Sequence, residues 1–394
     1  MTLEHSEAAV SKDANTAVLI SLDVCKDTHA ERLEELKQLV ISDNLVILAV
    51  VEGKCSHPNP ATFAGSGKVD EISLVLEQTG AALVIFNHDL SPAQQRNLSQ
   101  RLQCQVIDRT SLILDIFAQR AKSHEGKLQV ELAQLEHLAT RLVRGWSHLE
   151  RQKGGIGLRG PGETQLETDR RLIGKRMKLL KEKLEALQRQ RKVQRRSRQR
   201  AHVMSVSIVG YTNAGKSTLF NKLSRAQAYT ADQLFATLDT TTRKLFIPEQ
   251  GTVVISDTVG FIRDLPHTLV AAFRATLEET VQADILLHVV DVSGPNRDEQ
   301  IEEVNKLLKE IGADTIPQIL VSNKIDLANL STSSEGYERD EYGRISRIRL
   351  SARTGEGLAF VRLALAEAIA KDPERLCKDS TYEKATSGCA TAYL

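Results

Sequence analysis

The chain has 394 residues, of which 41% are hydrophobic and 26% charged, and its formal net charge is +1 at neutral pH. Two or three domains are expected at this length. The longest apolar run, residues 45–51, is too short to cross a bilayer, and the polar N-terminal segment does not resemble a signal peptide. Five scattered cysteines without a metal-ligand spacing indicate reduced thiols, so we expect a cytoplasmic protein without membrane contact.

Residues 1–125 alternate strand-like and helix-like segments. Short apolar runs rich in β-branched residues, such as AVLISLDV and NLVILAVV, are separated by helical patterns such as AERLEELKQLV. This alternation predicts a small parallel α/β domain. No phosphate-binding loop is visible in it.

Residues 126–200 predict a helical hairpin. Apolar side chains recur at alternating steps of four and three on both sides of a glycine-rich stretch, GGIGLRGPGE at 154–163. Such steps are typical of heptad seams. A connection of about a dozen residues makes an antiparallel hairpin within a monomer the simplest topology. A long parallel dimer is the alternative, but seams of about two or three heptads are short for it. The seam residues are Leu128, Leu132, Leu135, Ala139, Leu142, Trp146 and Leu149, then Ile173, Met177, Leu180, Leu184 and Leu187.

The second helix of this hairpin is strongly basic. Residues 170–200 contain fourteen Lys or Arg, and Glu182 and Glu185 are the only acids among them. A solvated helix face is one interpretation, and binding to a phosphate backbone is the other. Because the helix lacks aromatic residues for base stacking, the pattern favours structured RNA as the partner.

Residues 201–372 predict a P-loop nucleotide-binding domain, and the tail at 373–394 has no periodicity and is expected to be disordered. GYTNAGKS at 210–217 fits G-x-x-x-x-G-K-S, with an apolar strand before it and a helix after it. In this arrangement, backbone N–H groups and the helix N-terminus hold phosphates. We expect phosphate contacts from Gly210, Tyr211, Thr212, Asn213, Ala214, Gly215, Lys216, Ser217 and Thr218.

Three further motifs follow strands in the order that guanine-nucleotide switches require. VVISDTVG at 253–260 predicts a metal-directed Asp257 followed by Thr258, Val259 and Gly260, with the Gly260 N–H near the γ-phosphate. LVSNKID at 320–326 predicts guanine recognition, because the Asp326 carboxylate accepts from guanine N1–H and N2–H₂, where adenine offers no such pair. In this motif Asn323 braces the loop and Lys324 covers the ring. SARTGEG at 351–357 adds Ser351, Ala352 and Arg353, and we expect the Ala352 N–H to meet guanine O6.

The segment FATLDTTTR at 235–243 predicts a nucleotide-dependent switch with Phe235, Ala236, Thr237 and Leu238 near the nucleotide. By position we choose Thr237 as the threonine that meets Mg²⁺, with Thr240, Thr241 and Thr242 as alternatives. The expected Mg²⁺ ligands are therefore Ser217, Thr237 and Asp257.

The sequence offers no side-chain base for hydrolysis. Phe261 stands directly after D-x-x-G, where Ras-like GTPases carry a water-orienting glutamine. In GTPases with G-x-x-N-x-G-K-S, an asparagine at the position of Asn213 ligates a K⁺ that replaces an arginine finger, and capping of the loop is the alternative role. Both interpretations predict slow intrinsic turnover that a partner stimulates.

Together these segments resemble the HflX family, a group of Obg-related GTPases. The resemblance rests on GLRGPGETQLETDRR at 157–171, GYTNAGKSTLFN at 210–221, FATLD at 235–239 and DTVGFIRDLP at 257–266, and it extends over about residues 20–372. It implies a GTPase that binds the large (50S) ribosomal subunit and its 23S rRNA and, with GTP, splits stalled or idle ribosomes under heat or other stress.

The resemblance also implies a role for the hairpin loop, which would enter the peptidyl-transferase region. The rRNA-contacting candidates are Gly157, Arg159, Gly160 and Gly162. Two features depart from the family pattern. Thr240 stands after Asp239 where the family usually has proline, and only residues 373–394 follow where many members carry a further small domain. We expect either weaker ribosome anchoring at this end or a truncated form of the chain. The alternatives are a GTPase acting in ribosome assembly or on another structured RNA, and an ATP-dependent RNA remodeller centred on residues 1–125.

Overall fold

The computed structural model describes residues 15–24, 29–145, 161–200, 203–224, 234–263, 274–294, 296–328 and 336–370. The chain divides into two compact units, Met1–Gln119 with Lys127–Glu182 and Arg120–Gly126 with Lys183–Leu394. This division passes through three helices, Arg109–Arg120, His124–Gly145 and Pro161–Arg200, so the domain boundaries expected after residues 125 and 200 stay predictions. None of the described helices combines the length and apolarity that a membrane span requires.

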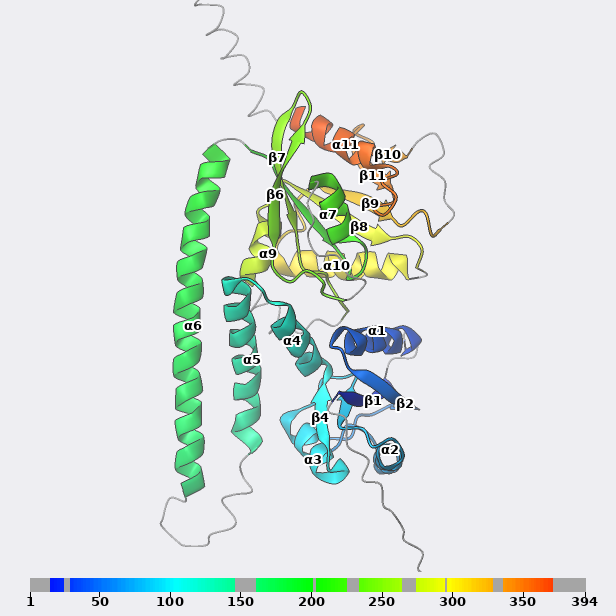
Figure 1. Ribbon diagram of the computed structural model, residues 1–394, viewed down its shortest axis with the longest axis vertical. Coiled ribbons are helices and arrows are strands. Elements are labelled where there is room, and N and C mark those ends of the chain that lie inside the picture. The colour runs from blue at the N-terminus through cyan, green and yellow to red at the C-terminus, as the bar shows by residue number, and fades with distance from the viewer. Residues whose placement is uncertain are drawn as a thin grey trace, which may run out of the picture. The chain divides into compact units, whose positions relative to one another are not determined.

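The first unit contains the expected parallel α/β fold (Figure 1). Its four strands are parallel in the order β2-β1-β3-β4. Helices cover both faces of this sheet, which explains why the run Ala17–Ile20 of β1 is fully buried and uniformly apolar. The elements are β1 (Thr16–Asp23), α1 (His29–Ser42), β2 (Val46–Lys54), α2 (Ser66–Thr79), β3 (Leu83–Phe86), α3 (Pro92–Leu102), β4 (Gln105–Asp108) and α4 (Arg109–Arg120).

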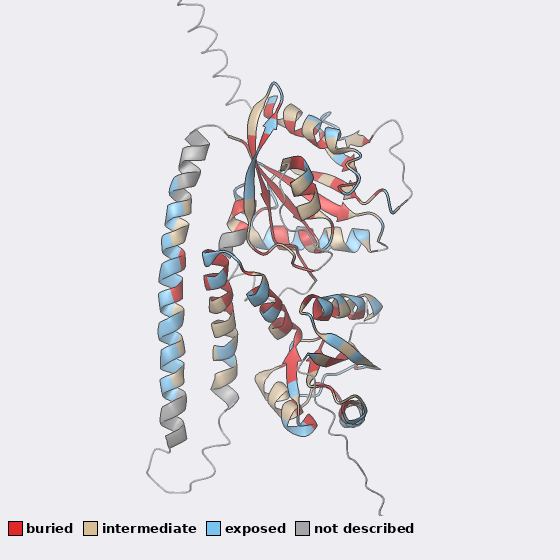
Figure 2. Ribbon diagram, viewed as in Figure 1, coloured by how far each residue is buried: buried red, intermediate tan, exposed pale blue. Residues whose placement is uncertain are grey.

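The predicted hairpin helices are α5 (His124–Gly145) and α6 (Pro161–Arg200). Buried seam residues lie on both helices, among them Leu132 on α5 and Leu180 on α6. The outer surface of α6 is exposed over most of its described length (Figure 2). The two helices are also joined by ion pairs, Arg176 with Glu131 and Lys181 with Glu136.

The glycine-rich stretch is shorter as a loop than we expected. Helix α6 begins at Pro161, so residues 161–163 form its first turn instead of the end of the loop. Proline is favoured at the first helical position because its missing N–H has no intrahelical partner there. Residues 146–160, with Gly157, Arg159 and Gly160, lie outside the described residues, as does the tail at 373–394.

The second unit is built on a seven-stranded sheet with the order β10-β11-β9-β8-β5-β7-β6. Its five central strands are parallel, and β6 and β10 are antiparallel edges. The elements are β5 (Ser205–Gly210), α7 (Lys216–Ser224), β6 (Thr241–Ile247), β7 (Gly251–Asp257), α9 (Arg274–Val281), β8 (Ile285–Asp291), α10 (Arg297–Ile311), β9 (Gln318–Asn323), β10 (Tyr337–Arg339), β11 (Ile345–Arg349) and α11 (Leu358–Ala370).

Two apolar cores hold this sheet. One packs α7 and α11 against one face, and the other packs α9 and α10 against the opposite face. The predicted motifs follow β5, β7, β9 and β11 and therefore meet at the carboxyl edge of the parallel strands, where open α/β sheets bind ligands.

Candidate functional site

The loop between β5 and α7 requires its two glycines. Gly210 has φ +149°, and a Cβ there would lie 2.2 Å from the carbonyl oxygen of Val289. Gly215 has φ +93°, and its Cβ would lie 2.2 Å from Nδ2 of Asn323. Any side chain at either position would push the loop away from the neighbouring strands, so the sequence fixes a tight turn that ends at the N-terminus of α7.

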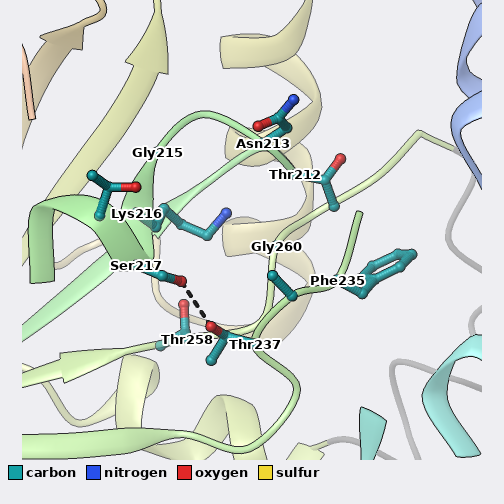
Figure 3. A pocket seen from close by; sticks show the side chains of 11 residues that line it. Thr212, Asn213, Gly215, Lys216, Ser217, Phe235, Thr237, Thr258 and Gly260 are labelled. Atoms are coloured by element: carbon teal, nitrogen blue, oxygen red, sulfur yellow. Dashed lines mark hydrogen bonds between the residues drawn. The ribbon is translucent and has the colours of Figure 1, made fainter. Parts of the chain in front are cut away.

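A pocket opens between this loop and the switch segment (Figure 3). It brings together eleven of the residues that the motifs predicted. They are Thr212, Asn213, Gly215, Lys216, Ser217, Thr218, Phe235, Ala236, Thr237, Thr258 and Gly260. The neighbouring Leu238 and Val259 were predicted nucleotide contacts too, but both side chains are buried and neither lines this pocket.

Lys216 is a buried cation at the floor of this pocket. Its side chain is 6% exposed, and Nζ donates to the carbonyl oxygen of Tyr211 at 2.6 Å. Burial lowers the pKa of Lys216 to about 8, although the nearby Asp257 acts in the opposite direction. An anion at this place would raise the pKa of Lys216 again, since an opposite charge favours the ammonium form.

Three oxygen-bearing side chains converge where a magnesium ion would bind. Ser217 Oγ donates to Asp257 Oδ2 at 2.7 Å and lies 2.7 Å from Thr237 Oγ1 (Figure 3). The second carboxylate oxygen, Asp257 Oδ1, is buried without a hydrogen-bond partner among the described residues. Burial raises the pKa of Asp257, and the Ser217 hydrogen bond opposes this shift. An orphaned carboxylate oxygen beside two hydroxyls fits the hard oxygen ligands that Mg²⁺ prefers.

The structure also distinguishes among the switch threonines. Thr241 and Thr242 belong to β6, where they pair with Asp257 and Ser256 of β7. Thr237 precedes this strand and is the threonine whose hydroxyl meets Ser217.

Phe261 is a core residue. Its backbone N–H donates to Gly210 O at 3.1 Å, and its carbonyl accepts from the Thr212 N–H at 2.7 Å. Its ring is 3% exposed and packs with Val209, Leu277 and other apolar residues. The preceding Gly260 lies so close to the P-loop that a Cβ would sit 2.9 Å from Cα of Thr212. The position after D-x-x-G thus anchors the switch to the P-loop and presents no base to the pocket.

Asn323 connects the P-loop with the motifs at 320–326 and 351–357, which we predict to bind guanine. Its Nδ2 donates to Ala214 O at 2.8 Å, as its predicted bracing role requires. Its Oδ1 accepts from the Ala352 N–H at 2.9 Å. The expected contact of this N–H with guanine O6 stays a prediction. A buried N–H takes the nearest acceptor, and here Asn323 provides it. Lys324 forms an ion pair with Asp291 at 2.7 Å.

The other residues predicted to contact the nucleotide differ in their exposure. Asp326 and Arg353 are exposed, and Ser351 is buried. Asn213 is exposed with φ +59°, and its side chain makes no hydrogen bond to the rest of the described chain. Loop capping by Asn213 therefore has no contact to support it.

Comparison with known proteins places this geometry in a family. Residues 30–118, 120–198 and 205–324 match the families described as GTP-binding GTPase N-terminal, GTP-binding GTPase Middle Region and 50S ribosome-binding GTPase. GTPase HflX of Escherichia coli K12 is 56% identical over 351 residues, which are 89% of this chain and 82% of that protein. The chain belongs to the HflX family of GTPases. HflX of Caldanaerobacter subterraneus is 46% identical over 95% of this chain and 85% of its own length.

Membership in the HflX family makes the chain a P-loop GTP hydrolase that binds GTP and GDP. The solved complex of SsGBP with GDP covers 91% of this chain and 99% of its own, with a TM-score of 0.50 and 24% identity, and so supports the fold. The HflX resemblance seen in the motifs is thereby confirmed.

Sequence reasoning missed one residue near this site. Asp239 follows Thr237 by two positions and binds the backbone of Lys122 and Ser123. No local pattern could have found this contact, because its partners lie more than a hundred residues earlier in the chain.

Proposed function

We propose that this HflX-family GTPase binds the 50S ribosomal subunit in its GTP state and splits stalled or idle ribosomes, particularly under heat or other stress. The observation that carries the proposal is the exposed basic surface of α6 in a chain of the HflX family of GTPases. Exposed cations along this helix are Arg170, Arg171, Lys175, Arg176, Lys178, Lys181, Lys183 and Arg189. Their summed charge would supply the affinity for rRNA phosphates.

The proposed nucleotide contacts follow from the pocket. The backbone of the P-loop and Lys216 would hold the β- and γ-phosphates, and Ser217, Thr237 and Asp257 would hold Mg²⁺. When bound, the ion would neutralise phosphate charge during transfer to water. Thr237 would then be held at the pocket only while the γ-phosphate is present, which makes the segment at 235–243 the switch.

Guanine recognition is assigned to Asp326, whose exposed carboxylate follows the braced Asn323. Lys324 would cover the ring, and Ser351, Ala352 and Arg353 would close the base side. A K⁺ beside Asn213 would stand in for an arginine finger. In support of this, the Asn213 side chain lines the pocket and has no partner elsewhere in the described chain.

We assign the cytoplasm as the location and a monomer as the acting form. The hairpin loop with Gly157, Arg159 and Gly160, together with Gly162 in the first turn of α6, would contact 23S rRNA, because bare glycine backbone can approach RNA closely. The family description of residues 205–324 as a 50S ribosome-binding GTPase supports the same partner.

Light scattering of 70S ribosomes tests the proposal. Adding the protein with GTP should lower the scattering as subunits separate, and adding it with GDP should not. A protein that hydrolyses GTP but leaves 70S scattering unchanged with either nucleotide would contradict ribosome splitting.

A further inference from the structure

The switch segment makes a contact outside the nucleotide pocket. The carboxylate of Asp239 accepts hydrogen bonds from the N–H groups of Lys122 at 2.8 Å and Ser123 at 2.7 Å, and from the Ser123 hydroxyl at 2.6 Å. All of these residues belong to the second compact unit. Because Asp239 follows Thr237 by only two residues, it cannot keep this position if the switch moves far from Ser217.

The partner of Asp239 is the start of helix α5. Ser123 is its N-cap, since the Ser123 Oγ accepts from the Gly126 N–H at 2.8 Å. Gly126 allows the approach, because a Cβ there would lie 2.1 Å from Asp239 Oδ1. The carboxylate also places negative charge at a helix N-terminus, where it is favourable.

The same helical turn contacts the basic helix. Glu125 forms an ion pair at 2.7 Å with Arg191 of α6. Burial raises the pKa of Glu125, Arg191 opposes the shift, and Asp239, Glu278 and Glu279 add to it. Arg191 is the cation that opposes the acidic neighbours of Glu125, and this ion pair holds α6 to the turn.

We propose that residues 120–126 form a relay segment that couples the switch to α6, with Asp239 as the positioning residue that connects them. While Thr237 is held at the pocket, Asp239 caps the relay segment, and Glu125 in turn holds Arg191. Loss of the γ-phosphate frees Thr237 and with it the cap. Such coupling is reciprocal. If a ligand of α6 binds the GTP form of the protein more tightly than the GDP form, that ligand raises the affinity for GTP relative to GDP by the same factor.

The nucleotide half of this relay is tested on the full chain without ribosomes. The measured quantity is the ratio of affinities for a non-hydrolysable GTP analogue and for GDP. Ser123→Ala and Gly126→Ala should each lower this ratio by about fivefold or more, while Ser123→Thr, which keeps a capping hydroxyl, should retain it.

Two features protect this test from misfolding artefacts. Gly126→Ala replaces a helical glycine by a better helix former, so it should not unfold α5 while it displaces Asp239. Ser91→Ala removes a comparable N-cap from α3, which belongs to the other compact unit, and should leave the ratio unchanged. An unaltered ratio in both Ser123→Ala and Gly126→Ala would overturn the relay.

The RNA half rests on the proposed function and is measured separately. Bound 50S subunits should raise the affinity for the GTP analogue in the wild type and not in Ser123→Ala at equal 50S occupancy. An equal rise in both proteins would overturn the coupling. If the wild type does not bind 50S at all, the proposed function fails, and the affinity ratio measured without ribosomes still decides the nucleotide half.

Discussion

Replacing Lys216 with methionine is expected to stabilise the nucleotide-free protein while it removes GTP binding. Burial lowers the pKa of Lys216 from 10.5 to about 8. At about 1.4 kcal/mol for each pKa unit, keeping this ammonium charged near pH 7 costs about 3 kcal/mol of folding free energy. Losing the hydrogen bond to Tyr211 O offsets about 1 kcal/mol, which leaves a net gain of about 2 kcal/mol for Lys216→Met.

The lowered pKa of Lys216 also predicts how the stability of the wild type changes with pH. The pKa of Lys216 is lower in the folded protein, so the unfolded chain binds more protons between about pH 8 and 10.5. Wild-type stability therefore rises with pH through this window, and the gap to Lys216→Met closes. The destabilising effect of Lys216 is complete below pH 8 and is lost as the pH approaches 10.5.

Urea unfolding of the full chain, followed by circular dichroism at pH 7 and pH 10, measures both effects. Lys222→Met is the matched control, because Lys222 is exposed on the same helix. A Lys216→Met protein that is less stable than the wild type at pH 7, or a gap of the same size at pH 10, would refute the reasoning.

Three further substitutions test the rest of the site. Asp326→Asn should lower GTP affinity by about a hundredfold or more and favour xanthine nucleotides, because the amide donates where the carboxylate accepted. An unchanged affinity for GTP would show that Asp326 does not bind the guanine base. Hydrolysis should be faster in KCl than in NaCl at equal ionic strength, and Asn213→Ala should abolish the difference; equal wild-type rates in the two salts would remove K⁺ from the account. Asn323→Ala leaves the buried Ala214 carbonyl and Ala352 N–H unpaired and should lower the free energy of unfolding, measured in urea, by about 3 kcal/mol. Asn296→Ala, at a helix cap without a side-chain hydrogen bond, should lower it little. Similar losses in the two variants would contradict the bracing role of Asn323.

Much of the second unit could be predicted because its information is local. Each motif follows an apolar strand, and parallel strands bring their carboxyl ends to one edge, so order along the chain implied proximity in space. Thr237 was chosen by position and stays a prediction, and the structure pairs two of its three alternatives, Thr241 and Thr242, in β6.

The contacts that escaped prediction depend on distant parts of the chain. Nothing around Ser123 indicates that its hydroxyl meets Asp239, since 116 residues separate them. The partner of the Ala352 N–H is likewise set by which acceptor the fold brings near it. The signal for the start of α6 at Pro161 is local, since proline is favoured at the first helical position. The glycines on both sides of Pro161 favoured a loop interpretation instead.

Co-sedimentation with purified 50S subunits tests the central claim most directly. The protein should pellet with 50S when it carries a non-hydrolysable GTP analogue and should remain mostly in the supernatant with GDP. It should be released as salt is raised, because we propose that α6 contacts rRNA phosphates. Equal pelleting with GTP analogue and GDP, or no pelleting with either, would contradict a GTP-switched ribosome-binding protein.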